Sequence, residues 1–396
     1  MTMASRPQAL PSPDHDALIQ SRELSRRIGK KIDADGGKIS FADFMQAALY
    51  TPKLGYYMND AAKFGPDGDF VTAPGISPLF SQCIATQCAQ IFAQLNTRMS
   101  IIEFGAGTGI MAADILLYLE QLDCLPEYYY IIEISPQLKM RQRTTLQKNC
   151  AHLLQHIIWL DELPVERINA IVLANEVLDA MPVELFTKAD GQDRQRFVGE
   201  KNEQFVFFDA EIENRALKLA LQDLTKQGID FADSYYSEIN LQIGTWLAKI
   251  QRSLQQGVIL LIDYGYTRQE YYHPQRASGT LQCHYQHSVH VDPLRLVGLQ
   301  DITAHVDFTA VALAAVEIDL AVLGFTSQSI FLLNNNLLNL VDAATSTGVK
   351  AIQKSQQIKQ LTLPSEMGEL FKVLALGKNI EINLQGFAIQ DRLHQL

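Results

Sequence analysis

Residues 100–110 read Ser-Ile-Ile-Glu-Phe-Gly-Ala-Gly-Thr-Gly-Ile, an apolar run that ends in an acid and a phenylalanine and then passes into three alternating glycines. The run predicts a buried strand at 100–104, and the apolar periodicity after it predicts a helix at 108–120. Glycines let the backbone approach a ligand closely, and the start of the helix offers unpaired N–H groups and a positive dipole end. The stretch therefore predicts a strand-turn-helix unit that binds a polar ligand at its turn.

The same alternation continues along the chain. Short apolar runs predict further strands at 129–133, 157–160, 169–174 and 258–262, and a helical pattern lies at 136–149. Strands that alternate with helices indicate right-handed βαβ units and a parallel sheet covered on both faces. The predicted fold class is α/β, a doubly wound, mostly parallel sheet.

Other segments flank this pattern. Helices are expected at 18–31, at 79–95 after the Ser77-Pro78 cap, and at 236–253, 309–322, 330–360 and 365–376, and strand-like runs at 196–198, 204–208 and 301–308. We expect the following division: a mobile tail at 1–17, an N-terminal helical segment and cofactor lid at 18–98, a core at 99–182 and 256–396 with a lid insertion at about 265–300, and a β/helical insertion at 183–255.

Composition excludes several classes of function. The 396 residues carry a net charge of -11, with 47% hydrophobic and 19% charged residues, which is typical of a globular protein that repels nucleic acid. No stretch has the apolar length of a secretion signal or a membrane span, so we expect a cytoplasmic protein with no membrane span and no nucleic-acid partner.

Cysteine and histidine spacing gives no metal pattern. The five cysteines form no C-x-x-C pair, which favours reduced thiols. The run Cys-His-Tyr-Gln-His-Ser-Val-His at 283–290 matches no strong zinc pattern, and no H-E-x-x-H motif accompanies it. We therefore expect no metal site.

The glycine turn decides between two cofactors. A dinucleotide fingerprint needs a glycine where this chain has Ile110, which disfavours a nicotinamide oxidoreductase. A strand that ends in Glu103 and enters G-x-G-x-G is instead typical of S-adenosyl-L-methionine enzymes, with the carboxylate near the cofactor's amino group. Glu133 ends the second strand, where an acid can accept hydrogen bonds from a ribose diol, although this alone does not separate the two cofactors. Asp161 follows the third strand, either near an adenine amino group or as a helix cap.

Acids also follow the fourth strand and the later strand at 258–262. Asn175 and Glu176, and then Asp179, come at the expected carboxyl edge of the sheet, where open α/β folds bind ligands, and Asp263 converges on the same edge. Carboxylates that bind a guanidinium fork and accept its proton would suit methylation of arginine. The alternatives are that Glu176 and Asp179 cap a helix, and that Asp263 pairs with a tyrosine or with backbone groups.

A family resemblance runs through most of the chain. Its blocks lie at 39–41, 50–57, 63–65, 68–74, 76–80 and 103–109, at Glu133 with 135–136, at 175–176 with 179–182, and at 263–266, 279–281 and 301–308. In this order they resemble the mitochondrial complex I assembly methyltransferase family, whose bacterial members are called MidA-like S-adenosyl-L-methionine-dependent methyltransferases.

The resemblance implies a class I (Rossmann-like) methyltransferase core with an added helical and β region. For the mitochondrial relatives it implies symmetric dimethylation of an arginine on a complex I subunit. It places Glu103, Gly105, Gly107 and Glu133 at the cofactor, with Gly109 in the same turn. It also implies that the N-terminal segment folds over the cofactor through Asp69, Thr72 and Ser77. The pair Val177-Leu178 departs from the aromatics expected there and affects the shape of the substrate pocket.

Residues and resemblance together predict a protein arginine N-methyltransferase that acts on a respiratory-chain or other cytoplasmic protein. Glu176, Asp179 and Asp263 are the predicted catalytic acids, and Asn175 and Asp161 join the predicted cofactor residues. The alternative from another class is a catalytically silent assembly factor that uses the cofactor fold to bind a partner protein. The sequence leaves a homodimer open.

Overall fold

The strand at 100–104 lies inside a larger sheet. A computed structural model of the chain describes residues 10–59, 72–343 and 348–396. Two compact units divide the chain. The small unit comprises Met1–Val71, Pro182–Asn240 and Ala277–Ala304, and the large unit comprises Thr72–Met181, Leu241–Arg276 and His305–Leu396.

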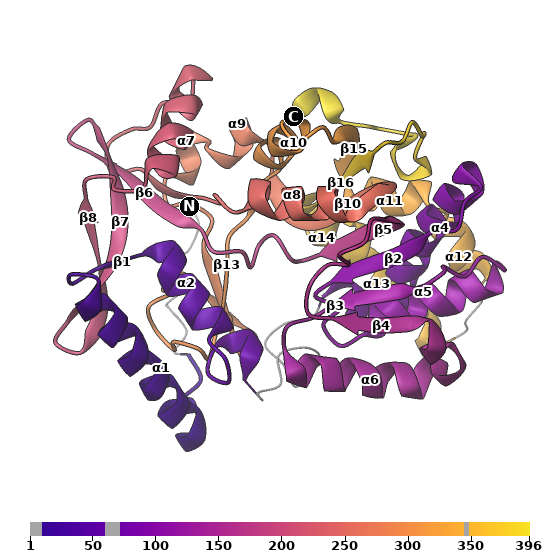
Figure 1. Cartoon of the computed structure of the whole chain (residues 1–396), viewed down its shortest axis with the longest axis horizontal. Helices are drawn as coiled ribbons and strands as arrows, with labels where there is room; N and C mark the ends of the chain where they lie inside the picture. Colours follow the sequence, from indigo (N-terminus) through magenta and orange to yellow (C-terminus); the bar gives the residue numbers. More distant parts are fainter. Residues whose placement is uncertain (1–9, 60–71, 344–347) are drawn as a thin grey trace. The chain divides into compact units, whose positions relative to one another are not determined.

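The large unit is built on an eight-stranded sheet of described residues. Its strands are β2 (Ser100–Phe104), β3 (Tyr129–Ile132), β4 (Ile157–Leu160), β5 (Ile168–Asn175), β10 (Leu254–Tyr266), β14 (Val306–Asp307), β15 (Ala321–Ser327) and β16 (Phe371–Lys378). The order is β15-β16-β10-β5-β2-β3-β4 (Figure 1). Strand β14 pairs with β10 off this path. Neighbours from β4 to β10 are parallel, whereas β16 is antiparallel to both β10 and β15. The predicted mostly parallel sheet is confirmed.

Helices cover both faces of this sheet because its strands are apolar on both faces. Successive residues of β2, Ile101 and Ile102, belong to different core clusters, and Leu260 and Leu261 of β10 alternate in the same way. One cluster is completed by α4 (Pro78–Leu95), α5 (Ile110–Gln121), α6 (Pro136–Cys150), α11 (Gln328–Asn334), α12 (Leu337–Ala343) and α13 (Val349–Thr362). The other is completed by α8 (Ile243–Ser253) and α10 (Phe308–Val316).

Two of these helices begin with a serine cap followed by proline. Ser77 accepts a hydrogen bond from the Leu79 amide at the start of α4, and Pro78 occupies the first turn, as predicted. Ser135 caps α6 by accepting from the Leu138 amide, with Pro136 following it. The serine hydroxyl satisfies an N–H group that has no partner inside the helix.

Several predicted helices are wrong in type or extent. The expected helix at 365–376 is the four-residue α14 (Met367–Leu370) followed by strand β16, whose residues are all buried. A strand buried on both faces has no period-2 signal that separates it from a buried helix. The helix expected at 309–322 stops at Val316, and a turn at 317–319 separates it from β15.

Two further ranges divide in the structure. The helix expected at 236–253 is strand β9 (Tyr236–Ile239) followed by α8, because residues 236–239 pair with β6 (Glu184–Ala189) in the small unit. The helical pattern at 330–360 contains the separate helices α11, α12 and α13. The predicted mobile tail includes residues 1–9, which lie outside the described residues.

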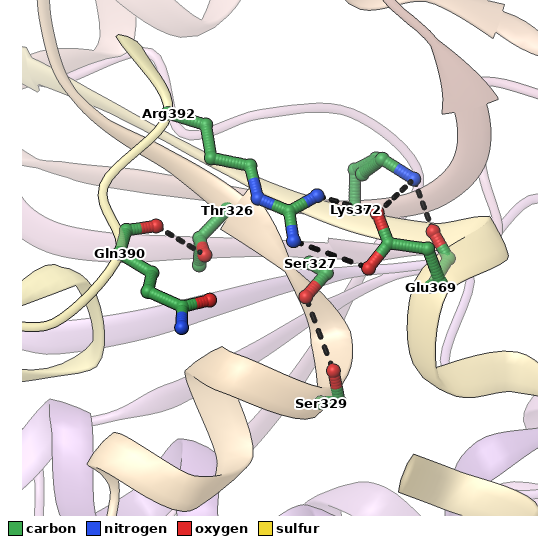
Figure 2. A network of polar contacts seen from close by, with 7 residues as sticks. All are labelled: Thr326, Ser327, Ser329, Glu369, Lys372, Gln390 and Arg392. Atoms are coloured by element: carbon green, nitrogen blue, oxygen red, sulfur yellow. Dashed lines mark hydrogen bonds and ion pairs between the residues drawn. The ribbon is translucent and has the colours of Figure 1, made fainter. Parts of the chain in front are cut away.

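The edge strand β15 is covered by the C-terminal segment. Arg392 N donates to Phe325 O at 2.7 Å, and the Thr326 hydroxyl donates to Gln390 O at 3.0 Å. Figure 2 shows the ion pairs beside it, in which Glu369 of α14 accepts from Arg392 and pairs with Lys372 of β16. The segment therefore satisfies backbone groups that an open edge strand would expose.

The small unit contains an antiparallel sheet of five described strands and a three-stranded sheet. The first has the order β1-β7-β6-β9, with β8 paired to β7, and the second has the order β12-β11-β13. Its elements not yet given are α1 (His15–Ala34), β1 (Ile39–Ser40), α2 (Phe41–Tyr50), β7 (Gln192–Lys201), β8 (Gln204–Ala210), α7 (Arg215–Lys226), β11 (Gln282–Tyr285), β12 (Ser288–His290) and β13 (Asp301–Thr303). Aromatic contacts between α2 and β8 hold its core, with Phe44 edge-on to Phe205 at 5.5 Å between ring centroids.

The compact units cut across the segments expected from the sequence. Helix α4, expected within an N-terminal segment at 18–98, packs on α5 beside the large sheet. The residues expected as a lid insertion divide at 276, so that α9 (Arg268–Tyr271) belongs to the large unit and β11 and β12 to the small one. Among the described helices, none has the length and apolar composition that a bilayer crossing requires.

The assignment of β16 as a central strand can be tested by mutation. Val373 and Leu374 are adjacent, fully buried and part of opposite core clusters. We expect Leu374→Ala to cost about 2–5 kcal/mol and Val373→Ala more than about 1 kcal/mol in free energy of unfolding, measured by denaturant titration. Exposed Leu338→Ala is the control, with a change within about 0.5 kcal/mol. If residues 365–376 formed a surface helix instead, one of the two substitutions, Val373→Ala or Leu374→Ala, would leave the free energy of unfolding unchanged.

Candidate active site

The glycine turn after β2 requires glycine at three positions. Gly105, Gly107 and Gly109 have φ angles of 60°, 52° and 81°, in the left-handed region that side chains disfavour. A Cβ on Gly109 would lie 3.0 Å from the Cα of Gln142 in α6, so this glycine also permits close helix packing. Among the described residues, a Cβ on Gly105 would meet only Val177 Cγ2, at 3.6 Å. Within this part of the chain, the backbone at Gly105 therefore has room beside it for a ligand.

Glu133 lies directly after β3 and is buried. Its Oε1 accepts from the Ser135 amide and its Oε2 accepts from Gln142 Nε2, both at 2.9 Å. Burial raises the pKa of Glu133, and these hydrogen bonds oppose the rise. Each carboxylate oxygen can accept a second hydrogen bond, so the pair remains suitable for a diol.

Gln142 is a site residue that the sequence analysis missed. Besides its bond to Glu133, its Nε2 donates to Gly107 O at 3.3 Å, and its Oε1 accepts from Trp159 Nε1 at 3.1 Å. It therefore links the glycine turn, Glu133 and β4. The sequence does carry a signal for this residue. Leu138, Gln142 and Leu146 recur at every fourth position and form the buried side of α6, and a glutamine is rarely fully buried without a specific role.

Glu103 lies near the end of β2 and is buried. Its Oε2 accepts from the Tyr129 hydroxyl at 2.8 Å. Burial raises the pKa of Glu103 to about 8; the Tyr129 hydrogen bond opposes this rise and the charge of Glu133 adds to it. A cationic group that binds near Glu103 would favour its ionised form.

The turn after β5 carries the predicted acids. Glu176 follows the strand with a φ of 52°, which is unusual for a residue other than glycine, and its amide donates to Ile262 O of β10 at 2.9 Å. Asn175 Nδ2 donates to Glu176 Oε1 at 3.2 Å. Since β5 lies beside β2, and Val177 is the nearest neighbour of the Gly105 Cβ position, the acids lie next to the glycine turn.

Asp263 holds this turn from β10. Its Oδ2 accepts from the amides of Val177, Leu178 and Asp179 at 3.2, 3.0 and 3.2 Å, and its Oδ1 accepts from the Tyr264 amide at 2.9 Å. Asp263 is fully buried. Burial and the charges of Asp179 and Glu176 raise its pKa, and the amide donors favour its charged form. Both oxygens are thus engaged by backbone groups.

Asp179 is also buried but is only half satisfied. Its Oδ2 accepts from the Tyr264 hydroxyl at 2.5 Å, whereas Oδ1 is buried without a hydrogen-bond partner within the described residues. Burial raises its pKa to about 6; the hydrogen bond from Tyr264 opposes this most, followed by the backbone amides of Ala180 and of Asp179 itself. In the described part of the chain the Asn175 Oδ1 is likewise buried and unpartnered. Buried polar atoms normally have partners, which makes these two oxygens candidates for ligand contacts.

The remaining predicted residues lie at other positions. Asp161 is exposed and pairs with Lys139 of α6, and no helix begins there that it could cap. Thr72 precedes the short α3 (Ala73–Ile76) without a side-chain cap, and Ser77 is committed to the cap of α4. Asp69 lies outside the described residues. No group of metal-binding side chains was found among the residues that the structure describes.

Comparison with known proteins identifies the family. The model of the Methyltransf_28 family, S-adenosyl-L-methionine-dependent methyltransferases, matches residues 83–326. The chain belongs to this family. The predicted family, fold class, enzyme class and S-adenosyl-L-methionine cofactor are confirmed.

Solved and curated relatives cover nearly the whole methyltransferase. A crystal structure of a Burkholderia thailandensis protein bound to S-adenosyl-homocysteine is 40% identical, covers 98% of this chain and 100% of that chain, and has a TM-score of 0.93. The mitochondrial protein arginine methyltransferase NDUFAF7 of Danio rerio is 26% identical over 90% of this chain and 87% of the relative. The Drosophila melanogaster homolog is 26% identical over 93% and 88%.

The residues at the glycine turn fit the cofactor of the methyltransferase family. The space beside Gly105 admits a ligand against the backbone, and Glu133 keeps acceptor positions for a diol. The start of α5 at Ile110 provides unpaired amides with a positive dipole end. S-adenosyl-L-methionine bound here would supply an electrophilic methyl group.

Cofactor binding should depend on pH through Glu103. Because its pKa is about 8, the neutral form dominates at pH 7, and binding of a cationic amino group must release its proton. We expect the affinity for S-adenosyl-homocysteine to rise between about pH 6 and about pH 8, with proton release detectable by calorimetry in buffers of different ionisation enthalpy. The Glu103→Gln variant should bind more weakly and without this rise. If the affinity for S-adenosyl-homocysteine changed equally with pH in both proteins, Glu103 would not be part of the cofactor site.

Gln142 should support cofactor affinity through Glu133. Gln142→Leu removes three hydrogen bonds at nearly constant volume, and we expect about tenfold weaker binding of S-adenosyl-homocysteine, since a hydrogen bond to a charged group contributes about 1.5–3 kcal/mol. Thr144→Ala, on the exposed face of the same helix, is the control and should bind normally. Unchanged affinity in Gln142→Leu would show that the link to Glu133 has no role in binding.

Proposed function

We propose that this methyltransferase transfers methyl groups to arginine side chains of a protein substrate. The observation that carries the proposal is the pair Glu176 and Asp179 beside the glycine turn, with Asp179 Oδ1 buried and unpartnered within the described residues. A guanidinium presents N–H donors and no acceptor, so it matches an oxygen such as Asp179 Oδ1, with the carboxylate of Glu176 nearby. The names of the curated relatives, protein arginine methyltransferases, support the same acceptor.

The proposed chemistry divides between positioning and proton removal. Glu176 and Asp179 bind the guanidinium and hold one nitrogen in line with the methyl carbon of S-adenosyl-L-methionine. The nitrogen–carbon bond forms as the carbon–sulfur bond breaks, and the electron pair of that bond stays on sulfur. The methylated nitrogen then passes its proton to a carboxylate, for which Asp179, with a pKa of about 6, is suited near neutral pH.

Asp263 has a different place in this proposal. Since both of its oxygens accept from backbone amides, it positions Glu176 and Asp179 and does not touch the substrate. In this proposal the cofactor is bound by Glu103, Gly105, Gly107, Gly109, Glu133 and Asn175. The other cofactor residues predicted from the sequence are Asp161, Asp69, Thr72 and Ser77.

We also propose a setting for the activity. The relatives named as mitochondrial arginine methyltransferases and the family resemblance together support a role in assembly of respiratory complex I. The Burkholderia thailandensis relative supports a bacterial, cytoplasmic setting.

The acceptor can be identified with labelled cofactor. The purified protein is incubated with radiolabelled S-adenosyl-L-methionine and an extract of cells that lack its gene, and the labelled product is hydrolysed and separated into methylated amino acids. We expect methylarginine. Glu176→Gln and Asp179→Asn should each lower the rate by roughly 10²-fold and retain binding of S-adenosyl-homocysteine. Glu166→Gln, an exposed acid preceding the opposite end of β5, is the matched control.

The same experiment separates the alternative functions. Label in another amino acid would refute the arginine assignment. Cofactor binding without methyl transfer to any protein of the extract would favour the catalytically silent assembly factor.

A further inference from the structure

Tyr264 connects β10 to the acids of the turn after β5. Its hydroxyl donates to Asp179 Oδ2 at 2.5 Å. It directly follows Asp263, whose carboxylate accepts the turn's amides. Two consecutive residues of one strand therefore position the backbone of the turn and the side chain of Asp179.

The ring of Tyr264 is held from two directions. It lies edge-on to His305, with centroids 5.0 Å apart, and edge-on to Phe371, with centroids 5.4 Å apart. Phe371 is the cross-strand partner of Tyr264 in the β10–β16 pair. Edge-to-face aromatic contacts restrict ring orientation, so the hydroxyl is placed before any substrate binds.

The hydrogen bond from Tyr264 makes the two oxygens of Asp179 different. Oδ2 is occupied, while Oδ1 is buried and has no partner in the described residues. Rotation of the carboxylate that exchanged the oxygens would break the bond to the hydroxyl. Only one oxygen is thus presented to a ligand.

We propose that Tyr264 is a positioning residue for methyl transfer, which fixes the Asp179 carboxylate so that Oδ1 alone receives the acceptor nitrogen. The inference rests on the proposed function only in placing the methyl acceptor at Asp179. It does not require that the acceptor be arginine.

The hydrogen bond from Tyr264 also affects the pH at which Asp179 ionises. Among the residues that the structure describes, the titratable groups around Asp179 are Glu176 on its own turn and Asp263 and Tyr264 on β10, with His305 against the Tyr264 ring. Burial raises the pKa of Asp179 to about 6, and the Tyr264 hydroxyl lowers it. Loss of the hydroxyl therefore raises the pKa further, and a reaction that needs ionised Asp179 loses its rate at a higher pH.

The test compares Tyr264→Phe with the unaltered protein and with Tyr266→Phe. The phenylalanine keeps the ring contacts and removes only the hydroxyl, and Tyr266 also contacts His305. The assay counts total methyl transfer from labelled S-adenosyl-L-methionine to the cell extract, whichever amino acid is modified. We expect Tyr264→Phe to lower the rate about tenfold, to move the acid limb of the pH profile upward, and to leave binding of S-adenosyl-homocysteine unchanged. Tyr266→Phe should behave like the unaltered protein.

A double variant asks whether Tyr264 acts through Asp179. If it does, Tyr264→Phe combined with Asp179→Asn should be no slower than Asp179→Asn alone. Additive losses, or an unshifted acid limb, would overturn the proposal. So would a rate loss in Tyr264→Phe that only follows lost cofactor binding.

A measurement without any acceptor completes the test. Infrared titration with ¹³C-labelled aspartate carboxyls identifies the Asp179 signal by its absence in Asp179→Asn. We expect Tyr264→Phe to raise the pKa of that signal, and an unchanged pKa would overturn the proposal even if the extract contains no substrate. Methyl transfer to a residue other than arginine would refute the proposed function and leave the Tyr264 result standing.

Discussion

The site depends on one buried acid, the carboxyl group of Asp263. It accepts hydrogen bonds from three successive amides of the turn after β5 and from the amide of Tyr264. A carboxyl group with no access to water is stable only when hydrogen-bond partners surround it, and here the donors are backbone groups of the turn and of β10. Glu176, in its left-handed conformation, directly precedes the three amides that Asp263 binds, so the same carboxyl group also shapes the turn.

A second set of contacts holds the cofactor side of the site. Gln142 contacts Gly107 and Glu133 from α6, and the missing side chain of Gly109 lets that helix approach the turn. Buried polar networks specify geometry when all their members are satisfied. The glycine turn is therefore shaped by α6, the helix of the next βαβ unit, as much as by its own residues.

Sequence reasoning was most successful where the chain carried local signals. The apolar run at 100–104, its glycines and the Ser77-Pro78 cap predicted the elements that form there. It failed at β16, because Phe371–Lys378 is buried on both faces and pairs with strands distant in sequence, a context that no local period records. Prediction of β9 failed for a related reason, since Tyr236–Ile239 finds its partner in β6.

Sequence position pointed to acids of the candidate site, but not to their contacts. Asp263 could be predicted from the sequence because it is an acid at the end of a predicted strand. Its four hydrogen bonds with backbone amides could not be predicted residue by residue, because they depend on the register between β10 and β5. Tyr264 and Gln142 were not singled out for the same reason, as hydrogen bonds between side chains of different elements appear only when the sheet is assembled.

The division of the chain into units has a consequence for its covalent connectivity. Each unit is assembled from three separate segments, so the polypeptide passes from one to the other at 71/72, 181/182, 240/241, 276/277 and 304/305. No single cut can therefore release either unit as one continuous fragment. If a protease cuts the chain at one of these five boundaries, the two units remain covalently joined at the other four. The passage at 181/182 comes two residues after Asp179, so the turn after β5 leads directly into the segment that enters the small unit.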